Sequence, residues 1–283
     1  MISKNQIKYI RQLEQKKFRR REGLFVAEGT KVVGDLLAAG FTPTQLFATE
    51  KWIQENQPQL RSQSSSKGPA GFTPSPVTDE ELRRVSFQQH PQQVLALFPL
   101  PSTTVPEPVA LELCSLATEG TQEGPHFSLF TLHSSLAIAL DGVQDPGNLG
   151  TIIRIADWFG ISTIICSDDT VDAWNPKVVQ ATMGSIARVN IIYTDLPALL
   201  DSLPADFPVY GTLLDGDNIY TQPLTAEGLI IMGNEGNGIS DAVRQRVNRR
   251  LLIPDFHQGD TADSLNVAIA TAITCSEFRR RSL

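Results

Sequence analysis

The chain has 283 residues, of which 41% are hydrophobic and 19% are charged, and its net charge at neutral pH is −7. This length suits two domains, and this composition is typical of a globular protein rather than of a disordered one. The sequence contains no run of 18 apolar residues and no apolar segment near its N-terminus, so we expect neither a membrane-spanning helix nor a secretory signal. Taken alone, the acidic balance points away from nucleic acid as a partner.

The charge is unevenly distributed along the chain. Residues 1–21 contain eight basic side chains against one acid, Glu14, which gives this segment a net charge of +7. The basic residues are Lys4, Lys8, Arg11, Lys16, Lys17, Arg19, Arg20 and Arg21. Such a block suits a phosphate backbone, although a solvated, flexible basic tail is the alternative. The spacing of Ile7, Ile10 and Leu13 favours a helix with one docked face.

Two more arginine clusters lie near the C-terminus, at 244–250 and at 279–281. Like-charged residues three or four positions apart on a helix repel one another. We therefore expect these arginines to find an anionic or carbonyl partner, or to face open water.

Residues 1–100 alternate between short apolar runs and amphipathic segments. The pattern predicts strands over 24–29, 45–48 and 94–98, and helices over 30–39, 51–60 and 79–85. Residues 61–76 are rich in Ser, Gly and Pro and indicate a long loop. We predict a small α/β domain over residues 1–100, followed by an extended connector over 101–134. Within that connector, the segment 109–116 could be a strand or a helix.

Residues 135–283 carry a stronger α/β pattern. The predicted strands are 136–140, 164–166, 189–193, 209–214, 229–232 and 251–253, and the predicted helices are 151–159, 176–182, 197–203, 241–247 and 264–278. Apolar strands that alternate with helices predict a parallel sheet covered by helices on both faces. Such sheets usually bind their ligand outside the carboxyl ends of the strands.

The first unusual loop in that position is 141–150, which opens a helix containing Arg154. Because the rest of this helix is apolar, we expect Arg154 to be buried and to need an anionic partner. A guanidinium beside the free amides of a helix N-terminus makes an anion site. The alternative is that Arg154 pairs internally with Asp157 or Asp145, and that the loop is only a turn.

Two further loops are unusual in composition. Residues 233–238 read GNEGNG, and three glycines in six residues allow a close approach of the backbone to a ligand. This loop matches neither a P-loop nor a dinucleotide fingerprint, and a tight strand–helix turn is the alternative. The polar loop 255–263 leads to Ser264, which we expect to cap an Ala-rich helix that packs closely on its neighbours. The alternative is a capped core helix.

Several function classes lack candidate residues. Cys114, Cys166 and Cys275 lie far apart and form no CxxC pair, which favours the reducing cytoplasm and argues against a Cys-rich zinc site. The four histidines are scattered, and no nucleophilic triad, metal-ligand spacing or pair of catalytic carboxylates is present in the sequence. We expect no metal, and group transfer from a bound cofactor is the chemistry that is left.

Taken in order, three segments resemble the signature motifs of the SpoU (TrmH-like) family of RNA 2′-O-ribose methyltransferases. They read DPGNLGTIIRIADWFG, LIIMGNEGNGIS and LLIP…SLNVAIATAI, and the resemblance covers residues 135–283. Residues 1–100 resemble the substrate-binding domain of the same family, through the stretch KKFRRREGLFVAEG and the strand HPQQVLALF. That fold is shared with certain RNA-binding ribosomal proteins.

The resemblance implies a fold and an activity that the pattern alone does not give. It implies a catalytic domain whose C-terminal segment threads a deep trefoil knot, a homodimer, and methyl transfer from S-adenosylmethionine (AdoMet) to a ribose 2′-OH of structured RNA. The N-terminal domain favours rRNA over tRNA as the substrate. A catalytically silent RNA-binding or ribosome-assembly factor on the same fold is an alternative, whereas a nucleotide-dependent oxidoreductase lacks its glycine fingerprint.

The resemblance also assigns roles to individual residues. Asn148 and Arg154 match the catalytic pair of the first motif. Three residues match the polar positions around the reacting ribose: Glu235, Ser264 and Asn266. Four positions match those that hold AdoMet, largely through backbone groups: Leu213, Gly233, Ile253 and Leu265. The loop 255–263 is longer than is usual in the family and borders the cofactor, and the connector is also longer than usual.

Overall fold

The computed structural model describes residues 2–58, 60, 72–101, 135–257 and 264–281. The chain folds into two compact units. Unit 1 comprises Met1–Ser102, Asp145–Asp157 and Val171–Val189, and unit 2 comprises Thr103–Gln144, Trp158–Thr170 and Asn190–Leu283. Nearly all of the predicted connector 101–134, with its segment 109–116 and Cys114, lies outside the described residues, as do residues 258–263 of the third loop. None of the described helices is long and apolar enough to cross a membrane.

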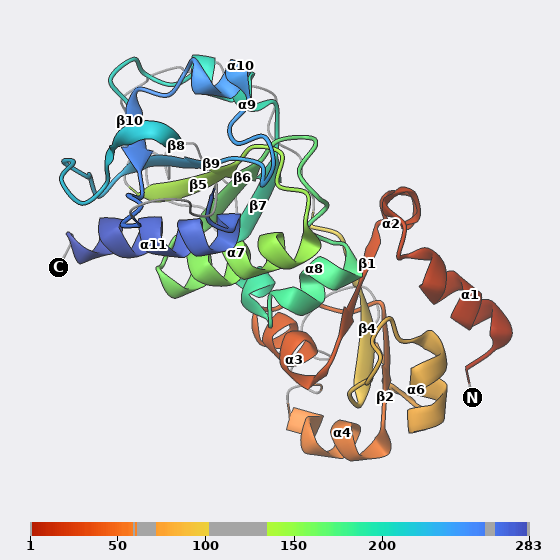
Figure 1. Cartoon of the computed structure of the whole chain (residues 1–283). Helices are drawn as coiled ribbons and strands as arrows, with labels where there is room; N and C mark the ends of the chain where they lie inside the picture. The colour runs from red at the N-terminus through yellow and green to blue at the C-terminus, as the bar shows by residue number, and fades with distance from the viewer. Residues whose placement is uncertain (1, 59, 61–71, 102–134, 258–263, 282–283) are drawn as a thin grey trace, which may run out of the picture. The chain divides into compact units, whose positions relative to one another are not determined.

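The N-terminal part of unit 1 is an α/β fold around one mixed sheet (Figure 1). Its elements are α1 (Lys4–Gln12), α2 (Lys16–Glu22), β1 (Leu24–Glu28), α3 (Thr30–Ala38), β2 (Gln45–Ala48), α4 (Glu50–Glu55), β3 (Ser75–Pro76), α6 (Asp79–Val85) and β4 (Val94–Pro99). The strand order is β1-β4-β2-β3, and β4 runs antiparallel to both β1 and β2. The prediction of a small α/β domain is confirmed, with the short strand β3 as an addition.

Helix α1 is docked and not a flexible tail. Ile10 and Leu13 are fully buried in a core that also contains Val26 of β1, Leu82 of α6 and Leu97 of β4. Ser3 begins α1 with a capping box, in which its hydroxyl accepts from the backbone of Gln6. The basic segment therefore forms two helices, α1 and α2, with one face packed on the sheet.

The rest of unit 1 consists of α7 (Pro146–Trp158), most of which belongs to this unit, α8 (Pro176–Ala181) and the 3₁₀ helix η2 (Ser185–Ala187). Helix α7 begins at Pro146, five residues earlier than predicted. Proline is favoured in the first turn because it has no N–H to satisfy, and the Asp145 carboxylate accepts from the Asn148 N–H at 2.8 Å. The first predicted loop is therefore shorter, and Asn148 lies within the first turn of the helix.

Unit 2 contains a six-stranded parallel sheet with the order β10-β8-β9-β5-β6-β7. The strands are β5 (Leu136–Leu140), β6 (Thr163–Cys166), β7 (Asn190–Tyr193), β8 (Val209–Asn218), β9 (Gly228–Met232) and β10 (Arg249–Leu252), and the helices are α9 (Leu196–Asp201), α10 (Asp241–Arg244) and α11 (Val267–Arg280). Leu200 and Val243, from α9 and α10, pack on one face with Leu229 and Ile231. On the opposite face, the ring of Phe278 from α11 meets Tyr210 of β8 edge-on. The predicted parallel sheet with helices on both faces is confirmed, and the knot stays a prediction.

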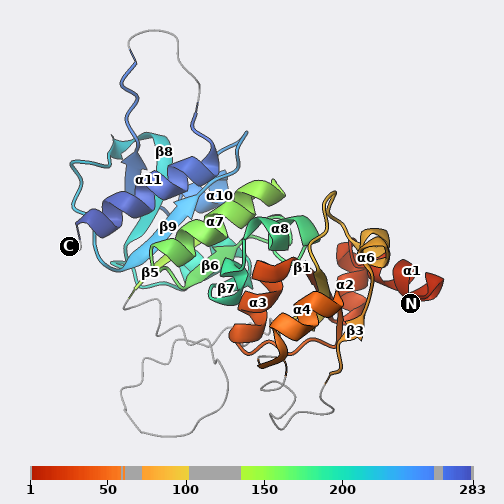
Figure 2. The ribbon, with the colours of Figure 1, turned by 90° about the horizontal axis from the view of Figure 1, so that it is seen from below.

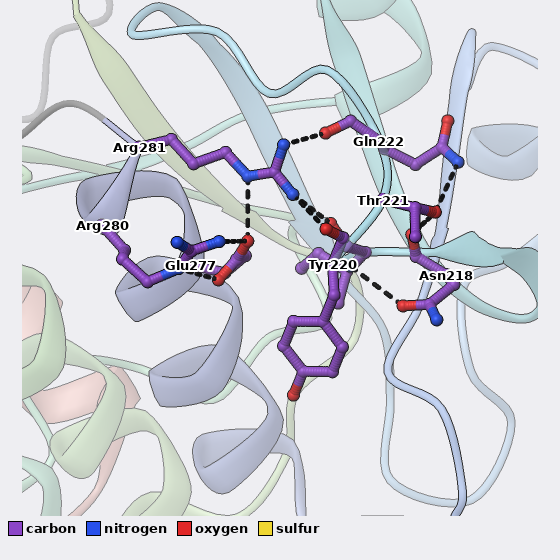
Figure 3. A network of polar contacts seen from close by, with 8 residues as sticks. Asn218, Tyr220, Thr221, Gln222, Glu277, Arg280 and Arg281 are labelled. Atoms are coloured by element: carbon purple, nitrogen blue, oxygen red, sulfur yellow. Dashed lines mark hydrogen bonds and ion pairs between the residues drawn. The ribbon is translucent and has the colours of Figure 1, made fainter.

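The arginine cluster at the end of the chain is tied into unit 2 (Figure 3). Arg281 donates to the carbonyl oxygens of Gln222 and Tyr220, in the loop after β8. Glu277 accepts from both Arg280 and Arg281 at 2.8–2.9 Å, and its side chain is only 5% exposed. These contacts fasten the end of α11 to that loop and confirm the prediction that these arginines need anionic or carbonyl partners.

We predict that Glu277→Gln lowers stability in a pH-dependent way. The two arginines hold the pKa of Glu277 at about 2, below its usual range, so the carboxylate stabilises the fold at neutral pH. This contribution fades as the pH falls from the pKa of an unfolded Glu, about 4.3, towards that of the folded residue. Urea unfolding should show a loss of about 1–2 kcal/mol at pH 7 and a much smaller loss near pH 2.5.

Glu55→Gln serves as the control for this measurement. Glu55 pairs with Lys51 on α4, where both side chains are more than half exposed, and such pairs contribute little. A loss for Glu277→Gln that stayed constant between pH 7 and pH 2.5 would contradict the assigned role of the carboxylate.

Candidate active site

The loops that follow β5, β6 and β9 in unit 2 are joined by hydrogen bonds. The Asn234 side-chain amide donates to the Gly142 carbonyl oxygen at 2.6 Å, and the Gly142 N–H donates to the Ser167 hydroxyl at 2.8 Å. Asn234 follows β9, Gly142 follows β5 and Ser167 follows β6. Gly142 has a φ of +73°, a conformation that favours glycine. The carboxyl ends of three parallel strands are therefore held in one arrangement.

Buried polar groups around these bonds are also satisfied. The Ser167 hydroxyl donates to Asp169 at 2.5 Å, and the Asp141 carboxylate accepts from the Ser240 N–H at 2.7 Å. Because an unpaired polar group in this position would destabilise the fold, the network constrains the loops strongly. Sequence reasoning missed Asp141, Ser167 and Asn234 as a group. The available signal was Asn234 within a glycine-rich turn, where Asn side chains commonly bond nearby backbone.

The glycine-rich loop after β9 folds back on itself. The backbones of Asn234 and Gly238 exchange two hydrogen bonds of 2.9 Å. A Cβ on Gly233 would overlap the backbone of Gly238 and Ile239, so only glycine fits there. The Asn234 side-chain oxygen accepts from the N–H groups of Gly236 and Asn237. At Gly233 the close approach is to the chain itself, which agrees with the alternative of a tight turn, and the predicted approach of this backbone to a ligand stays a prediction.

Strand β8 leaves the ladder for five residues at the same edge of the sheet. Consecutive residues of β10, Arg250 and Leu251, pair with Gly211 and Asp217 of β8, so 212–216 have no counterpart in β10. Pairing of β8 with β9 also ends at Gly211. Within this bulge, the side chain of Leu213 is buried and that of Leu214 is 75% exposed. Residues 212–216 of β8 therefore have no ladder partner in either neighbouring strand, and two of them are leucines.

The remaining positions assigned to the cofactor follow β10. Ile253 is half-buried directly after the strand, and Leu265, just before α11, is 50% exposed. All four positions assigned to the cofactor belong to unit 2. Leu213 lies in the bulge of β8, and Gly233 and Ile253 directly follow β9 and β10, the two strands that flank β8.

Two of the predicted catalytic residues lie on α7 in unit 1. The expectation that Arg154 is buried is wrong, because its side chain is exposed and forms no hydrogen bond or ion pair with the described residues. The alternative of an internal pair is also wrong, since Asp157 binds Arg188 and Asp145 caps the first turn. Asn148 and Arg154 are six residues apart, so helical geometry places them about 9 Å apart along the axis and on different faces.

The other three predicted catalytic residues, Glu235, Ser264 and Asn266, are exposed in unit 2. Ser264 was expected to cap the last helix, but α11 begins at Val267 and Asn266 is its N-cap. The Asn266 side-chain oxygen accepts from the N–H groups of Ala268 and Ile269, at 3.0 and 3.3 Å. Asn caps helices as well as Ser does, so the two residue types could not be ranked from sequence. The cap fixes the orientation of Asn266.

Of the eight basic N-terminal residues, Arg19 has a different environment from the others. It is 1% exposed, donates to Asp172 of unit 1, and also donates to the carbonyl oxygens of Leu13 and Glu14. Its interior position contradicts the prediction that it binds RNA. Lys16 is half-buried, and the other six are exposed: Lys4, Lys8, Arg11, Lys17, Arg20 and Arg21. Of these, Lys17 and Arg21 lie over the ring of Phe18.

Two families of known proteins match this chain, each over a different part of it. The SpoU rRNA methylase family matches residues 135–276, and the MRM3-like substrate binding domain matches residues 4–96. The match to the first family covers the loops 141–150, 233–238 and 255–263.

Individual relatives match over nearly the whole chain. A 23S rRNA (guanosine(2553)-2′-O)-methyltransferase from Bacillus subtilis is 28% identical over 98% of this chain and 97% of its own. The solved structure of a TrmH-family protein from Porphyromonas gingivalis is 37% identical, with a TM-score of 0.78 over 99% of both chains. An AdoMet-bound rRNA methyltransferase from Sinorhizobium meliloti is 30% identical, with a TM-score of 0.77 over 100% of this chain and 98% of that one. The chain belongs to the SpoU rRNA methylase family.

Proposed function

We propose that this protein transfers a methyl group from AdoMet to a ribose 2′-OH of rRNA. The observation that carries the proposal is the placement of the three signature segments. They follow β5, β9 and β10, whose carboxyl ends lie at one edge of a single parallel sheet. Ligands of open α/β sheets bind at that edge. The B. subtilis relative, which matches over both parts of the chain, is named for the same reaction on 23S rRNA.

The described residues fit AdoMet as the methyl donor. The bulge 212–216 offers backbone donors and acceptors outside the ladder, and Leu213 supplies a buried apolar side chain beside them. We assign the cofactor to this bulge together with Gly233, Ile253 and Leu265. When bound, AdoMet supplies a methyl group activated by its positively charged sulfur.

The protein's own task is then to position the ribose hydroxyl and to manage its proton. Arg154 is suited to the first part, since it is exposed and has no partner among the described residues. A guanidinium is too basic to act as a proton acceptor near neutrality. We therefore assign Arg154 to clamping a phosphate and stabilising the developing alkoxide, with the proton leaving through a neighbouring group or phosphate. Asn148, Glu235, Ser264 and Asn266 are assigned to the surroundings of the ribose.

We assign RNA binding to the exposed basic residues of α1 and α2. They lie within the segment that matches the MRM3-like substrate binding domain. Lys17 and Arg21 flank the half-buried Phe18, which combines positive charge with an aromatic ring. Such a combination suits a nucleic-acid backbone with exposed bases. The rRNA relatives favour rRNA over tRNA as the substrate.

Transfer of tritium from methyl-labelled AdoMet to rRNA of a deletion strain tests the proposal directly. We expect incorporation at a defined nucleotide, mapped as a 2′-O-methyl group, and restoration of that group in the strain by the plasmid-borne gene. RNA binding without AdoMet binding in calorimetry would instead favour the silent RNA-binding factor. Incorporation into tRNA alone would contradict the assigned substrate.

We predict that Arg154→Lys lowers turnover about 100-fold or more, since lysine lacks the planar pair of donors. The variant should fold and bind AdoMet normally, because Arg154 is exposed. Single-turnover methylation at saturating RNA measures the effect. Arg246→Lys is the matched control, since Arg246 is paired with Asp201 and should leave the rate unchanged. Near-wild-type turnover of Arg154→Lys would exclude a bidentate role.

We predict that RNA affinity falls steeply with salt despite the acidic net charge. Removal of residues 1–21 would strip Ile10 and Leu13 from the core, so substitution is the better test. Lys4, Lys8, Lys17 and Arg20 are exposed and can be changed to Gln together. The slope of log affinity against log salt should flatten by about 0.7–0.9 for each phosphate that the variant no longer neutralises. An unchanged slope, or an equal effect of the control Lys51→Gln/Lys177→Gln, would contradict the assignment.

We further propose that the protein acts as a homodimer, as the family resemblance implies. Unit 2 exposes large apolar side chains, including Trp158 at 83% and Ile269 at 52%. Burial of such side chains drives association. Light scattering after gel filtration should give about twice the chain mass of 31.0 kDa. A monomer mass at micromolar concentration would contradict the proposal.

A further inference from the structure

The helix that carries Arg154 is packed with the N-terminal residues. Residues 145–157 of α7 belong to the same compact unit as Met1–Ser102, and so do residues 171–189 with α8 and η2. The basic helices α1 and α2 and the catalytic candidate Arg154 are therefore parts of one unit. Figure 2 shows α8 beside β1, and contacts also join α3 to η2. The contacts that fix this packing therefore set the distance between Arg154 and RNA bound on α1 and α2.

A buried ion pair forms the first fixed point. The Arg19 guanidinium comes from α2, and its Nε lies 3.1 Å from the Asp172 carboxylate, four residues before α8 begins. The side chain of Arg19 is 2% exposed and that of Asp172 is 14% exposed. The Nη1 group of Arg19 donates to the carbonyl oxygens of Leu13 and Glu14, at 2.8 and 2.7 Å. Arg19 thus locks the turn between α1 and α2 and joins it to the segment that precedes α8.

A second fixed point lies just beyond Arg154. The Arg188 guanidinium donates to Asp157 of α7 at 2.7–3.1 Å and to Asp35 of α3 at 3.2 Å. The hydrogen bonds from Arg188 lower the pKa of Asp157, so this carboxylate is ionised at neutral pH. Asp157 is three residues from Arg154, less than one helical turn. One guanidinium therefore bridges the helix of Arg154 to a helix of the N-terminal fold.

Close packing connects the two fixed points. In α7, a Cβ on Gly150 would overlap Ala181 of α8, so the two helices are in backbone-level contact. The Trp174 ring, between Asp172 and α8, lies 4.6 Å from the ring of Phe25 in β1. A continuous chain of contacts thus runs from α2 through Arg19, Asp172 and α8 to α7.

Stability alone does not explain a buried ion pair in this place. Replacement of such pairs by apolar residues is often neutral or stabilising, because desolvation offsets the attraction between the charges. What the pair does supply is orientation, because Nε and Nη2 of Arg19 bind one oxygen of Asp172 while Nη1 binds two backbone carbonyl oxygens, so that the guanidinium is held from two sides.

We infer that Arg19–Asp172 and Arg188 are positioning residues that set the distance between RNA held on α1–α2 and the nucleotide presented to Arg154. The inference rests on the proposed methyltransferase function. On this reading, the enzyme selects its target nucleotide by its distance from an anchored RNA segment. Loss of the contacts made by Arg19–Asp172 or Arg188 leaves RNA binding intact but lets nucleotides next to the target reach Arg154.

Asp172→Asn tests the inference, with rRNA from a deletion strain as the probe. We expect an RNA dissociation constant within about twofold of wild type, because the exposed basic side chains are retained. The single-turnover rate at saturating RNA should fall about tenfold or more, since small misplacements of reactants are costly. Methyl groups should also appear on nucleotides that flank the wild-type target. The control Asp201→Asn breaks a two-point Asp–Arg pair in unit 2 and should change neither readout.

A lower melting temperature with an unchanged rate and a single unchanged target would overturn the inference, because a merely structural pair behaves in that way. If Asp172→Asn does not fold, Arg188→Gln decides, since Arg188 is half-exposed and its loss frees α7 at the other end. Arg188→Gln should show the same loss of rate and the same spread of targets, and wild-type values for both would overturn the inference. Failure of the proposed function has a different signature, namely no methyl transfer to any RNA by the wild-type enzyme.

Discussion

Parallel pairing brings the carboxyl ends of β5, β9 and β10 to one edge of the sheet in unit 2, and the proposed site depends on that constraint. Pairing alone does not fix the loops that leave this edge. A hydrogen bond from Asn234 to Gly142 fixes the loop after β9 to the loop after β5. A second hydrogen bond, from Gly142 to Ser167, fixes the loop after β5 to the loop after β6. Because each of these polar groups would be costly to bury unpaired, the loops are stable only as a set. These hydrogen bonds hold the loops of several strands in one arrangement.

The arginines of this protein differ in whether the fold already satisfies them. Arg19, Arg188 and Arg281 have carboxylate or carbonyl partners within their own unit. Arg154 has no such partner among the described residues. Exposure alone does not explain this difference, because Arg246 lies at the surface and is paired with Asp201. A charge that the fold does not use internally is available to a ligand, and this difference supports Arg154 as the residue that meets RNA.

The course of the chain was largely predictable, but the surroundings of its polar residues were not. Continuous apolar runs predicted the strands, because strands such as β5 and β9 are buried on both faces, and the spacing of apolar residues predicted the helices. The burial of Arg154 was wrongly predicted from the apolar composition of α7. The buried side chains of α7 form one stripe along the helix, which consists of Leu149, Ile152, Ile153 and Ala156, and Arg154 lies outside this stripe. The burial of Arg19 could not be foreseen, since its partner Asp172 is 153 residues away and only the tertiary fold joins them.

The overall charge of −7 is a poor guide to RNA binding, because charges of both signs are unevenly distributed over the chain. Arg244 and Arg250 share Asp215, and Arg280 and Arg281 share Glu277. Acids of unit 2 thus neutralise part of the charge of the later arginine clusters. Among the described residues, α1 and α2 present six exposed basic side chains, of which Arg21 pairs with Glu22. An RNA backbone responds to the local potential within about 8 Å at physiological salt, and not to a sum over the chain. Acidic residues elsewhere oppose non-specific adsorption of RNA to the rest of the surface, which agrees with the proposed contact of RNA with the N-terminal helices.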